Sequence, residues 1–205
     1  MQQSQTQYFM IRKGLEIMSN TNSPLQSKDQ IKSSNINLEY MDFIGKINLR
    51  IRDADTDVLN KVSAYLGYEL PKNSGEVSTN DESRTAWLGP NEFLIQCAED
   101  KKDNFIEDFN RNLNDYFYAL SDVSDYYITI RLSGEKSIDV LEKGCPLNFK
   151  EYLKNKNTCA QSYISKGTVL IDRLSDDKVF DILIRWSFAD YLWDWLSDSC
   201  SEFVD

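Results

Sequence analysis

The chain has 205 residues and a formal net charge of −10 at pH 7, and it contains no histidine. The negative charge argues against a nucleic-acid partner, because phosphates would be repelled. The lack of imidazole excludes a Ser-His-Asp triad, a Cys-His pair and a histidine metal site, although carboxylate, lysine or tyrosine chemistry stays open.

Length and composition fit one large domain or two smaller halves, with 41% hydrophobic and 27% charged residues. No apolar run approaches the roughly 18 residues of a membrane span, and the N-terminal YFMIRKGLEIM lacks the features of a secretory signal. We therefore expect a cytoplasmic protein without a membrane partner, whose four cysteines are reduced thiols. The sequence has no CxxC, GxG or GxxxxGK[ST] pattern, which argues against a zinc ribbon, a dinucleotide cradle and a P-loop.

Residues 1–40 are rich in Gln, Ser, Asn and Lys and show little apolar periodicity. They predict a disordered or loosely docked N-terminal tail, because they offer too little apolar surface to offset the entropy of ordering. Met18 is a conceivable alternative start, which would make residues 1–17 an extension that is dispensable for folding.

Residues 41–121 predict a first α+β half. Apolar and polar residues alternate over residues 47–51, which indicates a half-buried strand. Residues 55–67 have helical spacing and end at a glycine suited to a helix C-terminus. The remaining expected elements are two strands flanking Gly89-Pro90, a helix over residues 100–113 and a short strand over residues 116–120.

Residues 122–205 predict a second α+β half with a C-terminal helix. Its expected elements are a strand over 126–132, a helix ending at Gly144, strands over 159–165, 168–174 and 178–185, and a helix over 187–204 with a capping-box-like pair, Ser187 and Asp190. Strands and helices interleave, yet hairpin turns are frequent. The pattern predicts an α+β fold of two ferredoxin-like halves, with mostly antiparallel sheets and helices on one face.

The strand-turn-helix unit of residues 126–144 is the first candidate for chemistry. Ser133-Gly134 could expose main-chain N–H groups to an anion, but a serine N-cap beside a permissive glycine explains it better. Cys145 follows the helix C-terminus, whose dipole disfavours a thiolate, and Lys143 is the one nearby cation. We therefore expect an inert cysteine and a unit that builds the fold.

The last helix offers two further candidates. Asp190, Asp194 and Asp198 share one face and could form a metal or acid/base site, although such rows usually face solvent. An apolar stripe should pack on the chain's own sheet; it comprises Ala189, Leu192, Trp193, Leu196, Cys200 and Phe203. Tyr191 and Trp195 lie off this stripe, and we expect them to contact a partner subunit unless the N-terminal tail or the final residues cover them.

Several landmarks of the sequence together resemble one family, the gamma subunit of heterotetrameric sarcosine oxidase. They are NSPL at 22–25, INLRI at 47–51, LGYELP at 66–71, AWLGPNEFLI at 86–95, DVSD at 122–125, RLSG at 131–134, LEKGCPL at 141–147 and RWSFADYLWDWL at 185–196. Their order and spacing carry the resemblance over about residues 22–203. Asn91 and Phe93 depart from the Asp and Trp that the family usually shows.

The resemblance implies a fold related to the folate-binding aminomethyltransferases and no catalytic, cofactor-binding or metal-binding residue in this chain. It implies alpha, beta and delta subunits as partners. FAD and covalently bound FMN would lie on the beta subunit, NAD and the tetrahydrofolate site on the alpha subunit, and zinc on the delta subunit. Such a complex demethylates sarcosine to glycine, reduces oxygen to hydrogen peroxide and passes the one-carbon unit to tetrahydrofolate.

Two alternatives remain open from the sequence. One is a stand-alone folate-binding or aminomethyl-transfer protein, which would need a pocket with a carboxylate placed for the pterin ring. The other is the equivalent subunit of a related complex, such as an N-methylglutamate dehydrogenase.

Overall fold

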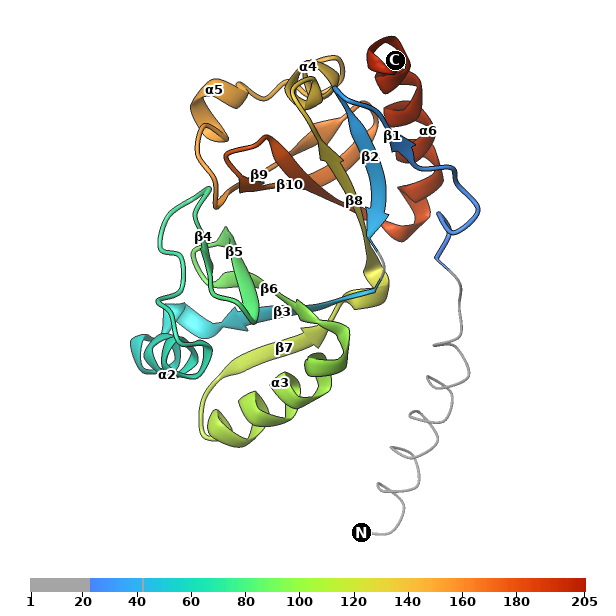
Figure 1. Cartoon of the computed structure of the whole chain (residues 1–205). Coiled ribbons are helices and arrows are strands. Elements are labelled where there is room, and N and C mark those ends of the chain that lie inside the picture. Colours follow the sequence, from blue (N-terminus) through green and yellow to red (C-terminus); the bar gives the residue numbers. More distant parts are fainter. Residues whose placement is uncertain (1–22, 42) are drawn as a thin grey trace.

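The computed structural model describes residues 23–41 and 43–205, which form two antiparallel β-sheets with helices packed on their outer faces (Figure 1). One buried core lies between each sheet and its helices, and a third, smaller core lies where the two sheets meet. The layers therefore run helix, sheet, sheet, helix, and the α+β class with antiparallel sheets is confirmed. In the described part of the chain, no helix is long and apolar enough to cross a membrane.

The first sheet has the strand order β4-β5-β6-β3-β7. Its strands are β3 (Ile44–Ile51), β4 (Val77–Thr79), β5 (Ser83–Gly89), β6 (Glu92–Ala98) and β7 (Tyr118–Asp122). Helices α2 (Thr56–Leu66) and α3 (Glu99–Asn112) bury their apolar faces against it. Counted along the chain, the four main strands lie in the order 4-1-3-2, which together with the βαββαβ sequence of elements is the ferredoxin-like arrangement.

The second sheet has the strand order β1-β2-β8-β11-β10-β9. Its strands are β1 (Ile31–Lys32), β2 (Asn37–Met41), β8 (Tyr127–Ser133), β9 (Thr158–Ile164), β10 (Gly167–Ser175) and β11 (Val179–Arg185), covered by α4 (Ser137–Glu142), α5 (Phe149–Tyr152) and α6 (Ala189–Cys200). Strand β2 lies beside β8, where a ferredoxin-like unit would hold the strand that follows its last helix. The second half is therefore a permuted unit that takes one strand from the N-terminal side of the first half.

This permutation corrects the expected tail. The prediction of a loosely docked segment over residues 1–40 is wrong for residues 23–40, and residues 1–22 lie outside the described residues. Leu25, Ile36 and Leu38 are 0% exposed, and β2 pairs with β8 over five residues. The polar composition led to the wrong prediction of a tail, because a strand of this kind needs only every second residue to be apolar. The predicted second half, residues 122–205, is incomplete without β2.

Two helix termini show which of the predicted caps the structure contains. Gly67 ends α2 in the left-handed conformation, with φ of 76°, as the sequence predicts. The Ser187/Asp190 capping box is wrong, because Ser187 lies in a 3-10 turn (Trp186–Phe188) that precedes α6, and no side chain caps that helix. At the N-terminus of α2, by contrast, a side chain does cap the helix: Asp55 accepts hydrogen bonds from the main-chain N–H groups of Asp57 and Val58.

The core role of β2 is testable by truncating one side chain. Leu38→Ala should lower the free energy of unfolding by about 2–5 kcal/mol, because it leaves a cavity in a fully buried position. The matched control is Glu39→Ala on the same strand, which removes a partly exposed pair with Lys32 and should change stability by less than about 1 kcal/mol. Urea titration measures both, and equal stability of the Leu38 variant and wild type would refute the core role.

Candidate functional site at the junction of the two sheets

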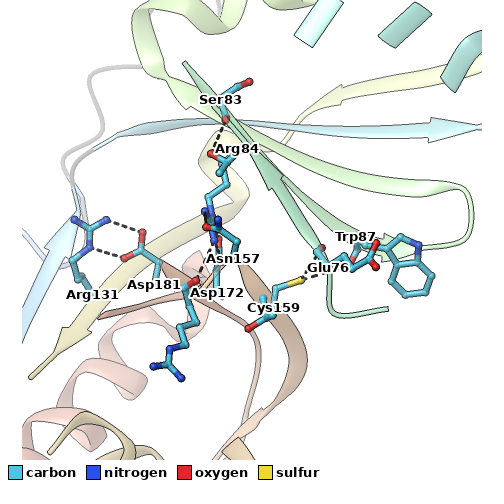
Figure 2. A network of polar contacts seen from close by, with 12 residues as sticks. Glu76, Ser83, Arg84, Trp87, Arg131, Asn157, Cys159, Asp172 and Asp181 are labelled. Carbon is cyan, nitrogen blue, oxygen red and sulfur yellow. Dashed lines mark hydrogen bonds and ion pairs between the residues drawn. The ribbon is translucent and has the colours of Figure 1, made fainter. Parts of the chain in front are cut away.

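The inner faces of the two sheets meet in a junction, which we define by the residues of the third core. These are Ala86 on β5, Leu94 on β6, Cys159 on β9, Leu170 on β10 and Leu183 on β11. Charged side chains lie around this small apolar cluster and form two ion pairs, one of which crosses from sheet to sheet (Figure 2). The junction is therefore the candidate functional site.

One ion pair crosses from sheet to sheet. Arg84 on β5 donates two hydrogen bonds of 2.6 Å to the carboxylate of Asp172 on β10, and a third of 2.8 Å to the side chain of Asn157. Asp172 is 0% exposed. Burial raises the pKa of Asp172, and the bidentate guanidinium opposes that rise. Figure 2 shows the arginine reaching across the gap between the ribbons to this carboxylate.

A second ion pair stands beside the first. Asp181 on β11 is the cross-strand neighbour of Asp172, and both carboxylates are buried. Arg131 on β8 donates hydrogen bonds of 2.7 and 2.9 Å to Asp181. Two neighbouring carboxylates would repel each other in a site of low polarity, so each needs its own guanidinium. With both carboxylates neutralised in this way, neither is poised to act as a general base.

A buried lysine lies where the chain passes between the sheets. Lys46 on β3 is 3% exposed, and its ammonium donates to the main-chain oxygens of Ile44 at 3.2 Å and Tyr127 at 3.3 Å. Burial lowers the pKa of Lys46 to about 8, although Glu99 and other carboxylates attract its charge. Such a group can titrate near physiological pH, but its hydrogen bonds hold it against the main chain.

All four cysteines are buried. Burial raises the pKa of Cys159, in the junction, to about 12, and it raises the pKa values of Cys97 and Cys200 to about 11. These three thiols therefore stay protonated at neutral pH and are poor nucleophiles. Cys145 is 6% exposed and lies 3.5 Å from the hydroxyl of Ser162.

The structure explains Ser133-Gly134 differently from the predicted serine cap. Ser133 does not cap α4, whose N-cap residue is Lys136 without a side-chain hydrogen bond, so that prediction is wrong. Gly134 has φ of +114°, and a Cβ there would lie 2.4 Å from the main-chain oxygen of Asn35. The glycine is needed because the segment leading into β2 passes directly over it.

The carboxylate row on α6 is partly neutralised by the segment that the sequence assigned to the tail. Lys28 lies 2.8 Å from Asp194 and 3.4 Å from Asp190. No group of three or more Cys, Asp or Glu side chains with metal-site geometry occurs within residues 23–41 and 43–205. The predicted inward stripe is confirmed for Ala189, Leu192, Trp193, Leu196 and Cys200, which are buried on α6. Phe203, the last residue of that stripe, lies beyond α6 in a 3-10 turn and is only half-buried against the same core.

The two predicted interface residues differ in their surroundings. Tyr191 is 36% exposed; its hydroxyl lies 2.7 Å from that of Ser165, and its ring packs edge-on against Phe188. Trp195 is half-buried against Gly144, where a Cβ would lie 2.4 Å from the indole ring. Truncating Trp195 would thus disturb the chain's own packing, so Tyr191 is the better probe of a partner contact.

Sequence reasoning did not single out Arg84, Asp172, Arg131, Asp181 or Lys46. A signal was available, because Asp172 and Asp181 interrupt the apolar strands TVLIDRL and VFDILIR. A lone charge in a buried strand requires a partner. The partner of Asp172 is Arg84, which lies 88 positions earlier in the sequence, and no local pattern reveals a pairing over that distance.

The lowered pKa of Lys46 predicts how the stability of the chain depends on pH. Its pKa is about 8 in the folded chain against an ordinary value of 10.5, so the unfolded chain binds more protons between these two pH values. Wild-type stability should therefore rise with pH across this window relative to Lys46→Met, by about 3 kcal/mol in total. Urea titrations from pH 7 to about 10.5 measure the difference.

The comparison with Lys46→Met cancels the titration of the thiols, which both proteins share. Lys166→Met, at an exposed position, is the control and should run parallel to wild type. A Lys46→Met curve that also runs parallel to wild type would show that burial does not perturb Lys46.

A family model described as "Sarcosine oxidase, gamma subunit family" matches residues 50–202. No curated protein gives a significant match. Among solved structures, the chain is similar to a chain of heterotetrameric sarcosine oxidase from Corynebacterium sp. U-96 in complex with pyrrole 2-carboxylate. The two share 26% identity with a TM-score of 0.77, over 86% of this chain and 89% of that chain.

The chain is also similar to glycine cleavage system aminomethyltransferase T from Bartonella henselae, with 14% identity and a TM-score of 0.60. That match covers 80% of this chain and 46% of the transferase, and at this identity it shows the fold alone. The predicted kinship in fold with aminomethyltransferases is therefore confirmed. The family model spans most of both sheets and all helices of the described chain. The chain belongs to the sarcosine oxidase gamma subunit family.

Proposed function

We propose that this gamma subunit is itself non-catalytic and supports the assembly of the large subunits of a heterotetrameric sarcosine oxidase. The observation that carries the proposal is the junction, in which each buried carboxylate is held by a guanidinium and the thiol of Cys159 is protonated. The Arg84–Asp172 pair joins the sheets, and none of these groups is left free to react with a substrate. A rigid unit of this kind suits a scaffolding subunit.

In this proposal the chain binds alpha, beta and delta subunits. FAD, FMN, NAD, zinc and tetrahydrofolate lie on those subunits, and the complex demethylates sarcosine to glycine. The matched chain from Corynebacterium sp. U-96 comes from a protein described as heterotetrameric, which supports partners of this kind. The rival reading, a stand-alone folate-binding protein, needs a free buried carboxylate for the pterin ring. Asp172 and Asp181 do not supply one, because both are engaged by arginine.

Exposed aromatic rings at the start of α6 support a partner contact there. Phe188 is 40% exposed and Tyr191 is 36% exposed, and their rings lie 6.4 Å apart. Large aromatic side chains of this type are typical anchors of protein interfaces. We therefore propose Tyr191 as an interface residue; Trp195, one turn further along α6, packs against Gly144 of the same chain.

The proposal predicts two results for the purified chain. Alone, it should show no flavin absorbance and should not oxidise sarcosine. Co-expressed with its alpha, beta and delta partners, it should elute with them on gel filtration, and the complex should be yellow and active. Stoichiometric flavin bound to the isolated chain, or separate elution from the other subunits, would contradict the proposal.

A further inference from the structure

A cavity of about 520 Å³ opens at the side of the junction, between α5, β9 and the loop that leads into β4. Its lining residues include two glutamates, Glu76 and Glu151, and two aromatic residues, Trp87 and Tyr152. None of its lining residues is a lysine or an arginine. The lining therefore carries negative charge beside the exposed ring of Tyr152, which suits a cation.

The negative charge of the cavity is fixed in place. The Glu76 carboxylate accepts hydrogen bonds from the main-chain N–H groups of Lys72 and Asn73, at 2.9 and 3.0 Å, and from the Asn73 side chain at 2.7 Å. Those hydrogen bonds hold the pKa of Glu76 below its usual value, so the group is ionised at neutral pH. Figure 2 shows Glu76 and Trp87 close together above Cys159 of β9.

The two aromatic residues of the lining differ in exposure. Trp87 is half-buried and packs against the core of the first sheet. Tyr152 is 57% exposed on the short helix α5, so it leaves a large apolar surface in water next to the cavity. A tyrosine in such a position contributes strongly to binding once a partner covers it.

The outer edge of β9 continues from this cavity. The edge is closed at one end by the N–H of Cys159, which donates to Gly75, and beyond the other end by the N–H of Ser165, which donates to Gly144. Between these points, the register with β10 turns the main-chain groups of Gln161 and Tyr163 outward. Neither has a main-chain partner on this side among the residues that the structure describes. An open edge of this kind can accept a further strand.

We propose that this edge and cavity form a docking site for an extended, arginine-bearing segment of a partner subunit. The segment adds a short strand beside Gln161 and Tyr163 and places its guanidinium beside Glu151 and the exposed ring of Tyr152 at the cavity. Main-chain hydrogen bonds then supply affinity, and the cavity supplies specificity. Arginine fits better than lysine, because its planar group both pairs with carboxylates and stacks on aromatic rings. The inference rests on the proposed function, since it requires partner subunits.

The test uses the co-expressed complex. Glu151→Lys reverses one charge of the cavity, and Tyr163→Pro removes one outward N–H without touching the β10 ladder. Each should weaken binding of this chain to the other subunits by about tenfold or more, as measured by titrating the purified chain into a complex that lacks it. Glu107→Lys, an equal charge reversal at an exposed position on α3, is the matched control and should bind as wild type does.

The outcomes separate the two proposals. If the wild-type chain itself fails to bind the other subunits, the proposed function is wrong and the docking site is overturned as well. If wild type binds and both variants bind equally well, the docking site alone is overturned. Deletion of residues 1–22 should leave binding unchanged, and a tenfold gain on that deletion would instead assign the site to the chain's own N-terminal segment and overturn the proposed occupant. Glu151→Lys changes an exposed side chain whose hydrogen bond comes from the exposed side chain of Asn148, so it decides the result if Tyr163→Pro fails to fold.

Discussion

The ion pair between Arg84 and Asp172 is the contact on which the arrangement of the two sheets depends. A carboxylate with no exposed surface is strongly destabilising unless a cation reaches it, and here that cation comes from the other sheet. The pair therefore favours one relative position of the halves over all others. The apolar cluster of the junction packs around it, and the Asp181–Arg131 pair completes the charge balance.

The path of the chain reinforces this coupling. It leaves the second sheet after β2, builds the first sheet, and returns at β8, so two connections cross between the halves. Lys46 and Ser124 tie these connections together, since the main-chain N–H of Lys46 donates to the hydroxyl of Ser124 and the N–H of Val123 donates to the main-chain oxygen of Lys46. Halves that are joined by two connections and by a buried ion pair have little freedom to move as separate domains. That rigidity fits the proposed role of the chain in assembly.

Local patterns predicted most of the elements, and the reasons are visible residue by residue. Alternation over Ile47, Leu49 and Ile51 predicted β3, and Gly67 marked the end of α2, because both signals act within a few residues. The failures have long-range causes. β2 appeared to belong to a tail, because its partner β8 lies about ninety residues later, and Gly134 gained its role from Asn35 rather than from its own helix. The junction was missed because the arginine that neutralises Asp172 comes from a different sheet.

A double-mutant cycle on the crossing ion pair tests the central claim most directly. Arg84→Met or Asp172→Leu alone should lower the free energy of unfolding by about 3–5 kcal/mol, because each leaves a buried charge without its partner. The double variant should lose much less than the sum, since it replaces two charges by two apolar groups. Additive losses below about 1 kcal/mol each, the size expected for the exposed Arg50–Glu92 pair, would contradict the account.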